Sequence, residues 1–485
     1  MQFKTILHAI EHYAATTPDA LCVADASGAE YTYSQFWKKI CGTAEHLISM
    51  GIKPGDRIVA KTSQTAKYLV LLHAVQLTGA VFVPLEKSVA VGRINEIIER
   101  TGAVLFTGDK ATDLCKSVNY LEFDFCADST PCALPEDTEA DAMILFTTGT
   151  TGKSKGIVLS FASEVAVAEN VVYGVEMKKG NVEVMPMPLN HSMCLRRYYA
   201  NIINGSASVF IDGVVFINIF FGMLDKYKAT SVAIAPSALS IIFRLSADRL
   251  GEYNTQLDYL QLGSSALPEE DKQTLLRLLP DVRLYNMYGS TEGGCACILN
   301  FNSDDNRPHC IGYPTKNSVF RLIDENGNET DSDTGFLSYG GSMCMKGYLD
   351  EPELTAKTVV DGFIRTSDLG KRDEAGRIYM LGRADDVIIT GGSKVSPEEI
   401  EEVAKAFPGI SECACCGADD KLLGKVPMLY IVQSGDDVDL KEMLKYLKDK
   451  LEGYKLPKQI IPVPELPRTY NGKLLRSKLN EMYLK

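Results

Sequence analysis

A repeated alternation of short apolar segments with longer amphipathic ones constrains the fold of this chain most strongly. The apolar segments are typical of buried strands, as at residues 57–60 and 80–85. Residues 68–78, between them, carry apolar side chains at helical spacing. The same alternation returns around residues 209–211 and 231–236. Strands that alternate with helices of this length predict βαβ units and a mostly parallel sheet, so the expected fold class is α/β.

Two stretches depart from this alternation. Residues 319–329 join an apolar segment to a turn sequence, Glu-Asn-Gly-Asn, which predicts a small antiparallel β unit. From Leu381 onward the chain changes to short strands, amphipathic helices and basic loops, which indicates a separate small α+β domain. A length of 485 residues agrees with more than one structural unit, because ordinary domains hold about 100–200 residues.

Net charge and composition indicate which kinds of binding partner this protein is not built to bind. The net charge is −13, and no cluster of lysine and arginine interrupts the acidic balance. Nucleic acid and anionic membranes are bound through basic patches, so we expect neither partner. The longest apolar stretch, residues 214–224, is interrupted by Asn218 and is too short to cross a bilayer. We expect a cytoplasmic protein without a membrane span, in which the 13 cysteines are reduced thiols.

A loop rich in glycine, threonine and lysine follows the apolar segment 142–146. It occupies residues 147–156 and reads Thr-Thr-Gly-Thr-Thr-Gly-Lys-Ser-Lys-Gly. Such a loop turns tightly and places N–H, hydroxyl and ammonium groups around an anion, which indicates a polyphosphate site. It is not a Walker A loop, because Thr147 stands where the first glycine belongs and no long helical pattern begins at Ser154. Taken alone, the composition also fits a polar surface connection.

A second candidate segment lies at residues 284–294, where an apolar strand ends in an exposed tyrosine, a glycine, a hydroxyl and a carboxylate. Tyr288 can stack on a base. Glu292, with the hydroxyl of Thr291, can hold Mg²⁺ together with nucleotide phosphates. The alternative is a turn at the end of a strand with a solvated glutamate.

Two more candidate segments lie toward the C-terminus. Asp368 is suited to accept hydrogen bonds from ribose hydroxyls, and Arg383 can donate to ribose or phosphate. Lys473 stands on a glycine turn before the last helix, from which an ammonium group can reach a developing negative charge. Taken singly, these groups fit a surface ion pair or a solvated lysine equally well.

Together and in this order, the four segments resemble the adenylate-forming superfamily of acyl-CoA synthetases, carrier-protein adenylation domains and luciferases. The resemblance covers essentially the whole chain. It implies a large N-terminal domain of layered sheets and helices with a small β unit, over residues 1–384. It also implies a small, mobile α+β lid domain over residues 385–485, with a hinge near Asp385.

The resemblance implies roles for matching positions. The β- and γ-phosphates of ATP would be gripped by Thr147, Thr148, Gly149, Thr150, Thr151, Gly152 and Lys155. The base and ribose would be held by Ser264, Asn286, Tyr288, Asp368 and Arg383. Mg²⁺ would be bound by Glu292 and Thr147. The reacting groups would be contacted by Lys473, Glu292, Thr291 and His191, and the coenzyme A channel would contain Gly391 and Gly392. Ser154 departs from the family, which usually has proline at that position.

The implied reaction has two steps. A carboxylate attacks the α-phosphorus of ATP to form an acyl-adenylate and expel pyrophosphate, and a thiol then displaces AMP. Mg²⁺, Lys473 and the loop N–H groups would offset the repulsion between the carboxylate and the polyphosphate. In the family, rotation of the C-terminal domain separates the steps.

The sequence narrows the acid without identifying it. In the family that this chain resembles, members that activate amino acids carry an aspartate here for the α-amine. No aspartate lies between Gly180 and Ser208, so the resemblance implies an aryl or fatty acid and not an amino acid. The expected pocket contains His191, Arg196, Arg197, Ala235 and Gly289. The two arginines are either structural or surface charges, or one of them meets a second carboxylate or polar tail on the substrate.

The acceptor and the assembly are also left open. Coenzyme A is the expected acceptor, and a separate acyl-carrier protein is the alternative. Luciferase-like oxygenation and a catalytically inactive nucleotide-binding protein are more remote. Either a monomer or a homodimer agrees with the sequence.

Overall fold

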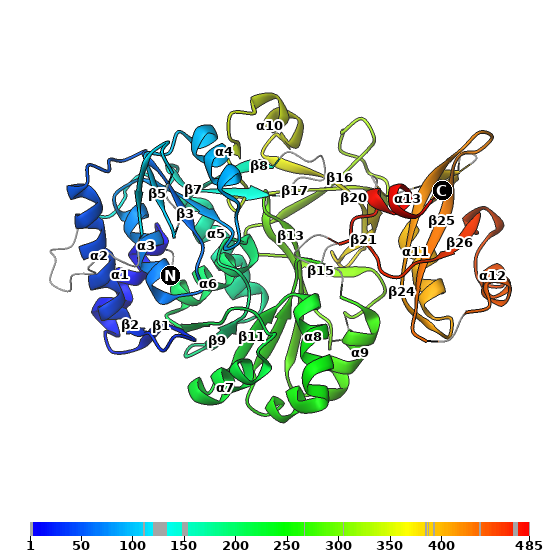
Figure 1. Ribbon diagram of the computed structural model, residues 1–485, viewed down its shortest axis with the longest axis horizontal. Coiled ribbons are helices and arrows are strands. Elements are labelled where there is room, and N and C mark those ends of the chain that lie inside the picture. The colour runs from blue at the N-terminus through cyan, green and yellow to red at the C-terminus, as the bar shows by residue number, and fades with distance from the viewer. Residues whose placement is uncertain are drawn as a thin grey trace. The chain divides into compact units, whose positions relative to one another are not determined.

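The computed structural model describes residues 3–109, 112–119, 133–147, 154–265, 267–303, 305–383, 386, 388–390, 393–435, 438–468 and 474–484. The chain forms two compact units, and Figure 1 labels many of their elements. The first unit comprises Met1–Arg321, Ser338–Arg365 and Ala375–Ile378. The second comprises Leu322–Leu337, Thr366–Glu374 and Tyr379–Lys485.

One sheet of the first unit contains the two strands on either side of the Gly/Thr/Lys loop. Its order is β18-β8-β7-β4-β3-β5-β6, parallel from β7 to β6 and antiparallel where β7, β8 and β18 pair. The strands are β3 (Arg57–Lys61), β4 (Val81–Leu85), β5 (Leu105–Thr107), β6 (Lys116–Val118), β7 (Asp141–Thr147), β8 (Lys155–Ser160) and β18 (Gly347–Tyr348). Thr147 pairs with Lys155 at the ends of β7 and β8, so the loop residues connect two neighbouring strands.

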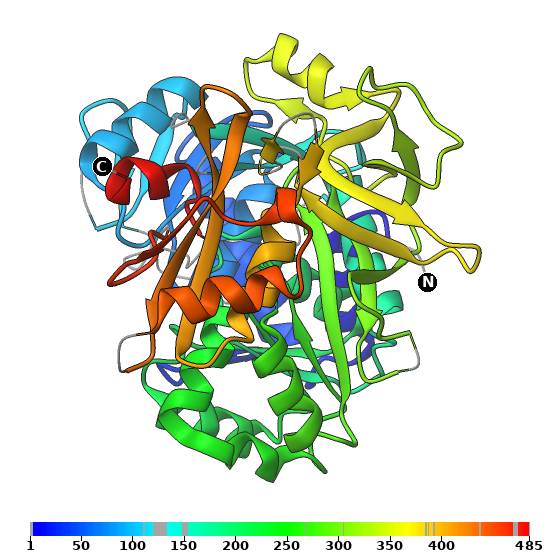
Figure 2. The ribbon, with the colours of Figure 1, turned by 90° about the vertical axis from the view of Figure 1, so that its right-hand side faces the viewer.

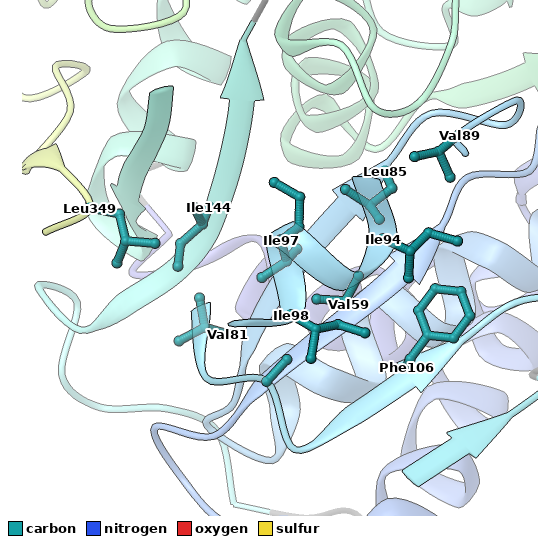
Figure 3. Close-up of a cluster of buried hydrophobic side chains, with 12 residues drawn as sticks. Val59, Val81, Leu85, Val89, Ile94, Ile97, Ile98, Phe106, Ile144 and Leu349 are labelled. Atoms are coloured by element: carbon teal, nitrogen blue, oxygen red, sulfur yellow. The ribbon is translucent and has the colours of Figure 1, made fainter. Parts of the chain in front are cut away.

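An apolar cluster joins this sheet to helix α4 (Val91–Thr101). Ile94, Ile97 and Ile98 recur at helical spacing and point from α4 toward Val59 and Phe106 (Figure 3). All five side chains are buried. The cluster extends along the sheet to Ile144 on β7 and to Leu349, which follows β18.

A second sheet of the first unit is parallel through its centre. Its strands follow the order β15-β14-β13-β12-β11-β9-β10-β1-β2, with parallel pairing from β13 to β1. The strands are β1 (Leu21–Asp25), β2 (Glu30–Thr32), β9 (Val182–Met185), β10 (Ala207–Phe210), β11 (Ser231–Ile234), β12 (Tyr259–Leu262), β13 (Arg283–Ser290), β14 (Gly294–Asn300) and β15 (Cys310–Pro314).

Helices of the first unit pack on these sheets (Figure 1). They are α1 (Ile6–Thr16), α2 (Tyr33–Ser49), α3 (Ala66–Leu77), α5 (Phe161–Gly174), α6 (Ser192–Asn204), α7 (Ile217–Tyr227), α8 (Pro236–Ser246), α9 (Glu269–Leu278), α10 (Pro352–Thr358) and the 3₁₀ helix η2 (Ala247–Tyr253). Helix α5 contacts β8 of one sheet, β14 of the other and its neighbour α6, so these two helices lie where the two sheets meet.

A further β region pairs in the order β16-β17-β20-β21, with the short β19 on β20. Its strands are β16 (Val319–Ile323), β17 (Thr334–Gly340), β19 (Val359–Val360), β20 (Phe363–Arg372) and β21 (Ile378–Arg383). The turn sequence after residue 323 connects β16 to β17, as predicted.

The C-terminal part of the second unit is a small α+β body (Figure 2). It contains β22 (Ile388–Thr390), β23 (Ser393–Val395), α11 (Pro397–Lys405), β24 (Ile410–Asp420), β25 (Gly424–Gln433), α12 (Leu440–Lys448), η3 (Gly453–Lys455), β26 (Gln459–Pro462) and α13 (Ser477–Tyr483). Alternate residues of β24 face opposite sides: Cys415 packs with α11 and α12, whereas Ala414 and Cys416 pack with α13.

The predicted α/β fold class is confirmed, including the large sheet-and-helix portion and the smaller C-terminal α+β portion. Strand β9 ends at Met185, and prolines follow at positions 186 and 188. Among the residues that the structure describes, no helix combines the length and apolarity needed to cross a bilayer.

Candidate active site

Four of the predicted pocket and base-binding residues lie at or just beyond the carboxyl ends of neighbouring strands. Ala235 follows β11, Ser264 follows β12, Gly289 is near the end of β13, and His191 follows the loop after β9. These strands are adjacent and parallel, so their ends meet at one edge of the sheet. That edge is where ligands bind in open α/β sheets.

His191 begins helix α6 as its N-cap residue, and burial lowers the pKa of its imidazole. The ring is therefore neutral at pH 7. The chain before it is held by Gln64, whose amide donates to Met187 O (2.6 Å) and accepts from Leu189 N (2.8 Å). Gln64 lies more than 120 residues earlier, and its role gave no signal in the sequence.

Ser264 has a backbone φ of +75°, which is uncommon for a residue with a side chain. Its hydroxyl lies 2.9 Å from Met193 Sδ on α6. A Cβ on the preceding Gly263 would come within 3.3 Å of Met193 and Met287. The turn after β12 is thus held tightly against α6, and strain of this kind concentrates at functional sites.

Asn286 on β13 has a buried Oδ1 for which the described residues provide no hydrogen-bond donor. An unpaired buried acceptor is costly unless a ligand or water satisfies it, and the amino group of a purine base is such a donor. Tyr288, two residues on, is half-buried and packs against Phe320 and Tyr339 (centroid distances 6.5 and 6.0 Å). The prediction that Tyr288 is exposed was therefore wrong, because aromatic neighbours from β16 and β17 cover it.

The turn from Ser290 to Gly294 is the most crowded part of the site. Ser290 Oγ accepts a hydrogen bond from Gly293 N (3.0 Å) and lies 3.0 Å from Tyr339 Oη. A Cβ on Gly289 would lie 2.0 Å from Gly294 O, and one on Gly293 would lie 2.2 Å from the Tyr339 ring. Only glycine fits at these two positions, because backbone and the Tyr339 ring already fill the space that a side chain would take.

Glu292, in this turn, is held by Tyr348, whose hydroxyl donates to Glu292 Oε1 (3.0 Å). Lys155 Nζ lies 5.2 Å from the centroid of the Tyr348 ring. The structure thus connects the metal-binding candidate to a residue of the predicted phosphate loop. No sequence signal pointed to Tyr348.

The donor set fits Mg²⁺ bound with a nucleotide. Glu292 offers a carboxylate, and Thr147 at the end of β7 offers a hydroxyl. Mg²⁺ prefers oxygen ligands, and in nucleotide sites it takes one or two from protein carboxylates and the rest from phosphates and water. Among the described residues, no group of three or more His, Cys, Asp and Glu side chains could form an all-protein metal cage.

Helix α6 contacts this turn through two side chains. Ser192 Oγ lies 3.3 Å from Thr291 Oγ1, and the Arg196 guanidinium donates to Ser290 O. Arg196 is 5% exposed, and within the described part of the chain it has no carboxylate at ion-pair distance. Burial lowers the pKa of Arg196.

Arg197, the next residue, has different surroundings. Its guanidinium pairs with Glu183 (Nε to Oε1, 3.0 Å) and donates to Tyr259 Oη and Gln261. Both charged side chains are fully buried. Of the two roles predicted for the arginines, these contacts favour a structural charge for Arg197, because its guanidinium is paired with internal partners.

A small cavity of about 20 Å³ lies between α5, α6 and the turn, large enough for about one water molecule. Ser192, Arg196, Thr291 and Glu164 line it. Glu164 on α5 accepts hydrogen bonds from Gln76 Nε2 (2.9 Å) and Tyr199 Oη (3.1 Å), and burial raises its pKa to about 8. Nothing in the sequence distinguished Glu164 from a solvated glutamate on the surface of a largely apolar helix.

In the second unit, the two predicted ribose-binding residues lie together. Arg383 Nε is 3.6 Å from Asp368 Oδ1, and the pair joins neighbouring strands β20 and β21. Several other predicted positions lie outside the described residues and stay predictions: Thr148, Gly149, Thr150, Thr151, Gly152, Asp385, Gly391, Gly392 and Lys473.

Comparisons with known proteins place the chain in a family. The sequence profile of the AMP-binding enzyme family matches residues 10–349, and that of the AMP-binding enzyme C-terminal domain matches residues 399–473. A 2-succinylbenzoate–CoA ligase from Bacillus licheniformis is 28% identical over 489 residues, covering 97% of this chain and 98% of the relative.

Solved structures agree over the full length. ATP-bound MatB from Rhodopseudomonas palustris has a TM-score of 0.90 at 25% identity, covering 100% of this chain and 99% of that one. MenE from Bacillus subtilis, in complex with the acyl-adenylate OSB-AMP, shares the fold with a TM-score of 0.85 at 22% identity, covering 97% of each chain. The family expected from the four motifs is confirmed: the chain belongs to the AMP-binding enzyme family and is of its acid–CoA ligase type.

Proposed function

We propose that this chain uses ATP to convert a carboxylic acid into an acyl-adenylate and then transfers the acyl group to the thiol of coenzyme A, releasing AMP. The observation that carries the proposal is the turn that holds Glu292 and Thr291. It lies next to the carboxyl ends of the parallel strands, and Glu292 contacts Tyr348, on which Lys155 also packs.

In this proposal the base is bound along β13. Asn286 Oδ1 would accept from its amino group, and the turn at Ser264 would lie against its ring. In the second unit, Asp368 would accept hydrogen bonds from the ribose hydroxyls, and Arg383, 3.6 Å from that carboxylate, would donate to the ribose or phosphate.

The residues around the turn would act on the phosphates and the acid. Glu292 and Thr147 would hold Mg²⁺, which supplies positive charge at the polyphosphate. Lys155 and Lys473 would add positive charge near the groups that repel each other, the carboxylate and the phosphates. His191 is neutral because it is buried, so it would orient the acid by hydrogen bonding or packing and would not trap it as an ion pair.

We propose an aryl acid ahead of a fatty acid. Relatives that match essentially the whole chain carry the name 2-succinylbenzoate–CoA ligase, and this name refers to an aryl acid. The proposed pocket is formed by the residues at the strand ends, His191, Ala235 and Gly289. Arg196 is the remaining candidate for a second polar group on the acid, because Glu183 already neutralises Arg197.

The test is pyrophosphate release with ATP and Mg²⁺ across aryl, fatty and dicarboxylic acids, each with and without coenzyme A. The proposal expects one acid class to give release, with turnover to an acyl-CoA when coenzyme A is present. Release without acylation of coenzyme A would indicate a carrier protein as the acceptor. Nucleotide binding without turnover of any acid would contradict the proposal and support a non-catalytic role.

A further inference from the structure

Tyr348 lies in a short segment that is fixed on three sides. Its strand, β18, pairs with β8, with Tyr348 opposite Ile157. Its backbone N–H donates to Thr355 Oγ1 (2.9 Å), and Met345, three residues earlier, donates from its N–H to Glu292 O (2.7 Å). Leu349, the next residue, packs in the buried cluster with Ile144 (Figure 3). The position of the Tyr348 ring is therefore set by the fold.

The hydroxyl of Tyr348 points at the candidate metal ligand. It donates to Glu292 Oε1 at 3.0 Å, and this leaves Oε2 and one lone pair of Oε1 for other partners. A phenolic hydroxyl keeps its proton at neutral pH, so Tyr348 remains a hydrogen-bond donor to this carboxylate. A neutral donor restricts the rotation of the carboxylate without cancelling its charge.

The ring face of Tyr348 serves a second group. Lys155 Nζ lies 5.2 Å from the ring centroid, within the range of a cation–π contact. Lys155 begins β8, and Gly156 O accepts from Leu349 N (2.8 Å), so the backbone of the same segment also holds this end of the loop. One side chain thus contacts both a carboxylate and an ammonium group.

We infer that Tyr348 is a positioning residue that sets the Glu292 carboxylate for Mg²⁺ and the Lys155 ammonium for the nucleotide phosphates. The inference rests on the proposed function in assuming that Mg²⁺ and ATP bind at this turn. In the absence of nucleotide, Glu292 and Lys155 attract each other, and a direct ion pair would remove one metal ligand and one phosphate contact. Tyr348 gives each group a neutral partner instead.

Two substitutions separate the hydroxyl from the ring. Tyr348→Phe keeps the ring under Lys155 and removes the hydrogen bond to Glu292. Tyr348→Leu removes both contacts. Binding of a non-hydrolysable ATP analogue is measured for each variant at increasing Mg²⁺ concentrations and again in EDTA, so that no acid or turnover is required.

For Tyr348→Phe we expect the Mg²⁺ concentration at half-maximal analogue binding to rise roughly tenfold, because a hydrogen bond to a charged group is lost. Binding in EDTA should stay within about twofold. Tyr348→Leu should show the same rise in the Mg²⁺ requirement and, in addition, binding in EDTA about two- to fivefold weaker, because the ring no longer supports Lys155.

Tyr253→Phe is the matched control. Tyr253 is also buried in the first unit, and its hydroxyl also lies within hydrogen-bond distance (3.0 Å) of a carboxylate, that of Asp225, on helix α7. Its Mg²⁺ requirement should equal that of the wild type. An unchanged or lower Mg²⁺ requirement in Tyr348→Phe, or an equal rise in Tyr253→Phe, would overturn the inference. A wild type that binds the analogue with Mg²⁺ but activates no acid would contradict the proposed function and leave the test of Tyr348 intact.

Discussion

Arg196 and Arg197 are neighbours on helix α6, and both are buried, but the two sides of the helix that they occupy differ in kind. On one side Arg197 is neutralised by Glu183 and hydrogen bonded to Tyr259 and Gln261, all on strands of the central sheet. On the other side Arg196 donates to a backbone carbonyl of the 290–294 turn, next to the Ser192–Thr291 contact. The first side is an internal network around a buried ion pair, and the second borders the proposed ligand site.

The comparison separates two kinds of buried charge, one with a carboxylate partner and one without. A buried charge that is paired and fully hydrogen bonded contributes to a unique fold, and removing its partner is costly. A buried charge without a carboxylate partner costs stability on its own, and it is more readily explained by what it does for the neighbouring turn. We therefore expect substitution of Arg197 mainly to lower stability and substitution of Arg196 mainly to lower activity.

The largest effect is expected from Arg197→Met. This substitution leaves Glu183 buried without its cation, which typically costs about 3–5 kcal/mol of unfolding free energy. Chemical denaturation followed by circular dichroism measures the loss. The double variant Arg197→Met with Glu183→Gln should recover part of it. A stability equal to the wild type would contradict the assignment of this side of α6 to the fold.

Glu292→Gln should give the largest effect on activity. The amide is a neutral and weaker ligand of Mg²⁺ than the carboxylate, and loss of one electrostatic group of this kind lowers rates about 10²–10³-fold. The melting temperature should stay close to that of the wild type, since Glu292 is half-buried. Acid-dependent pyrophosphate release is the measurement, and a loss of less than fivefold would remove Glu292 from the site.

Arg196→Met should reverse the pattern of Arg197→Met. A hydrogen bond from a charged donor to Ser290 O is lost, so we expect kcat/KM for ATP to fall about 10- to 100-fold. Unfolding free energy should change by less than about 1 kcal/mol, because removing an unpaired buried cation offsets the lost hydrogen bond. Arg196→Met could instead lose as much stability as Arg197→Met and keep its activity per folded molecule. Arg196 would then be a structural charge like Arg197, and the proposed difference between the two sides of α6 would be wrong.

Glu164→Gln tests the buried acid beneath α6. Burial raises the folded-state pKa of Glu164 to about 8 from the ordinary value of 4.5, so the folded state holds a proton that the unfolded state releases between those pH values. The stability from this proton is fully present below about pH 4.5 and is lost as the pH rises toward 8. Glu164→Gln should remove this decline and be about 1–3 kcal/mol more stable than the wild type at pH 8. Melting temperatures from pH 5 to 8 measure it, and parallel curves for the two proteins would contradict the raised pKa.

Much of the fold and part of the site could be predicted from the sequence. The alternation of apolar strands and helices predicted the parallel sheets, since it reflects local periodicity. Asn286, Glu292 and the Asp368–Arg383 pair stood in recognisable sequence segments, on strands or directly after them. The contacts of Gln64 and Tyr348 could not be predicted, because each depends on segments more than 50 residues apart in the chain. Arg196 and Arg197 have different surroundings because they lie on different sides of α6. The sequence does not show that one side packs on β9 and β12 and the other on the turn after β13.

We would first look for the acyl-adenylate itself, because the proposed reaction at this site must form it. The wild type is incubated with ATP, Mg²⁺ and 2-succinylbenzoate or another aryl acid, without a thiol, and the acyl-AMP is identified by mass spectrometry. We expect acyl-AMP with one equivalent of pyrophosphate, its conversion to an acyl-CoA when coenzyme A is added, and formation of both products about 10²–10³-fold more slowly by Glu292→Gln. If no aryl or fatty acid gives acyl-AMP while the Mg²⁺-dependent binding of ATP is intact, the proposed reaction is contradicted.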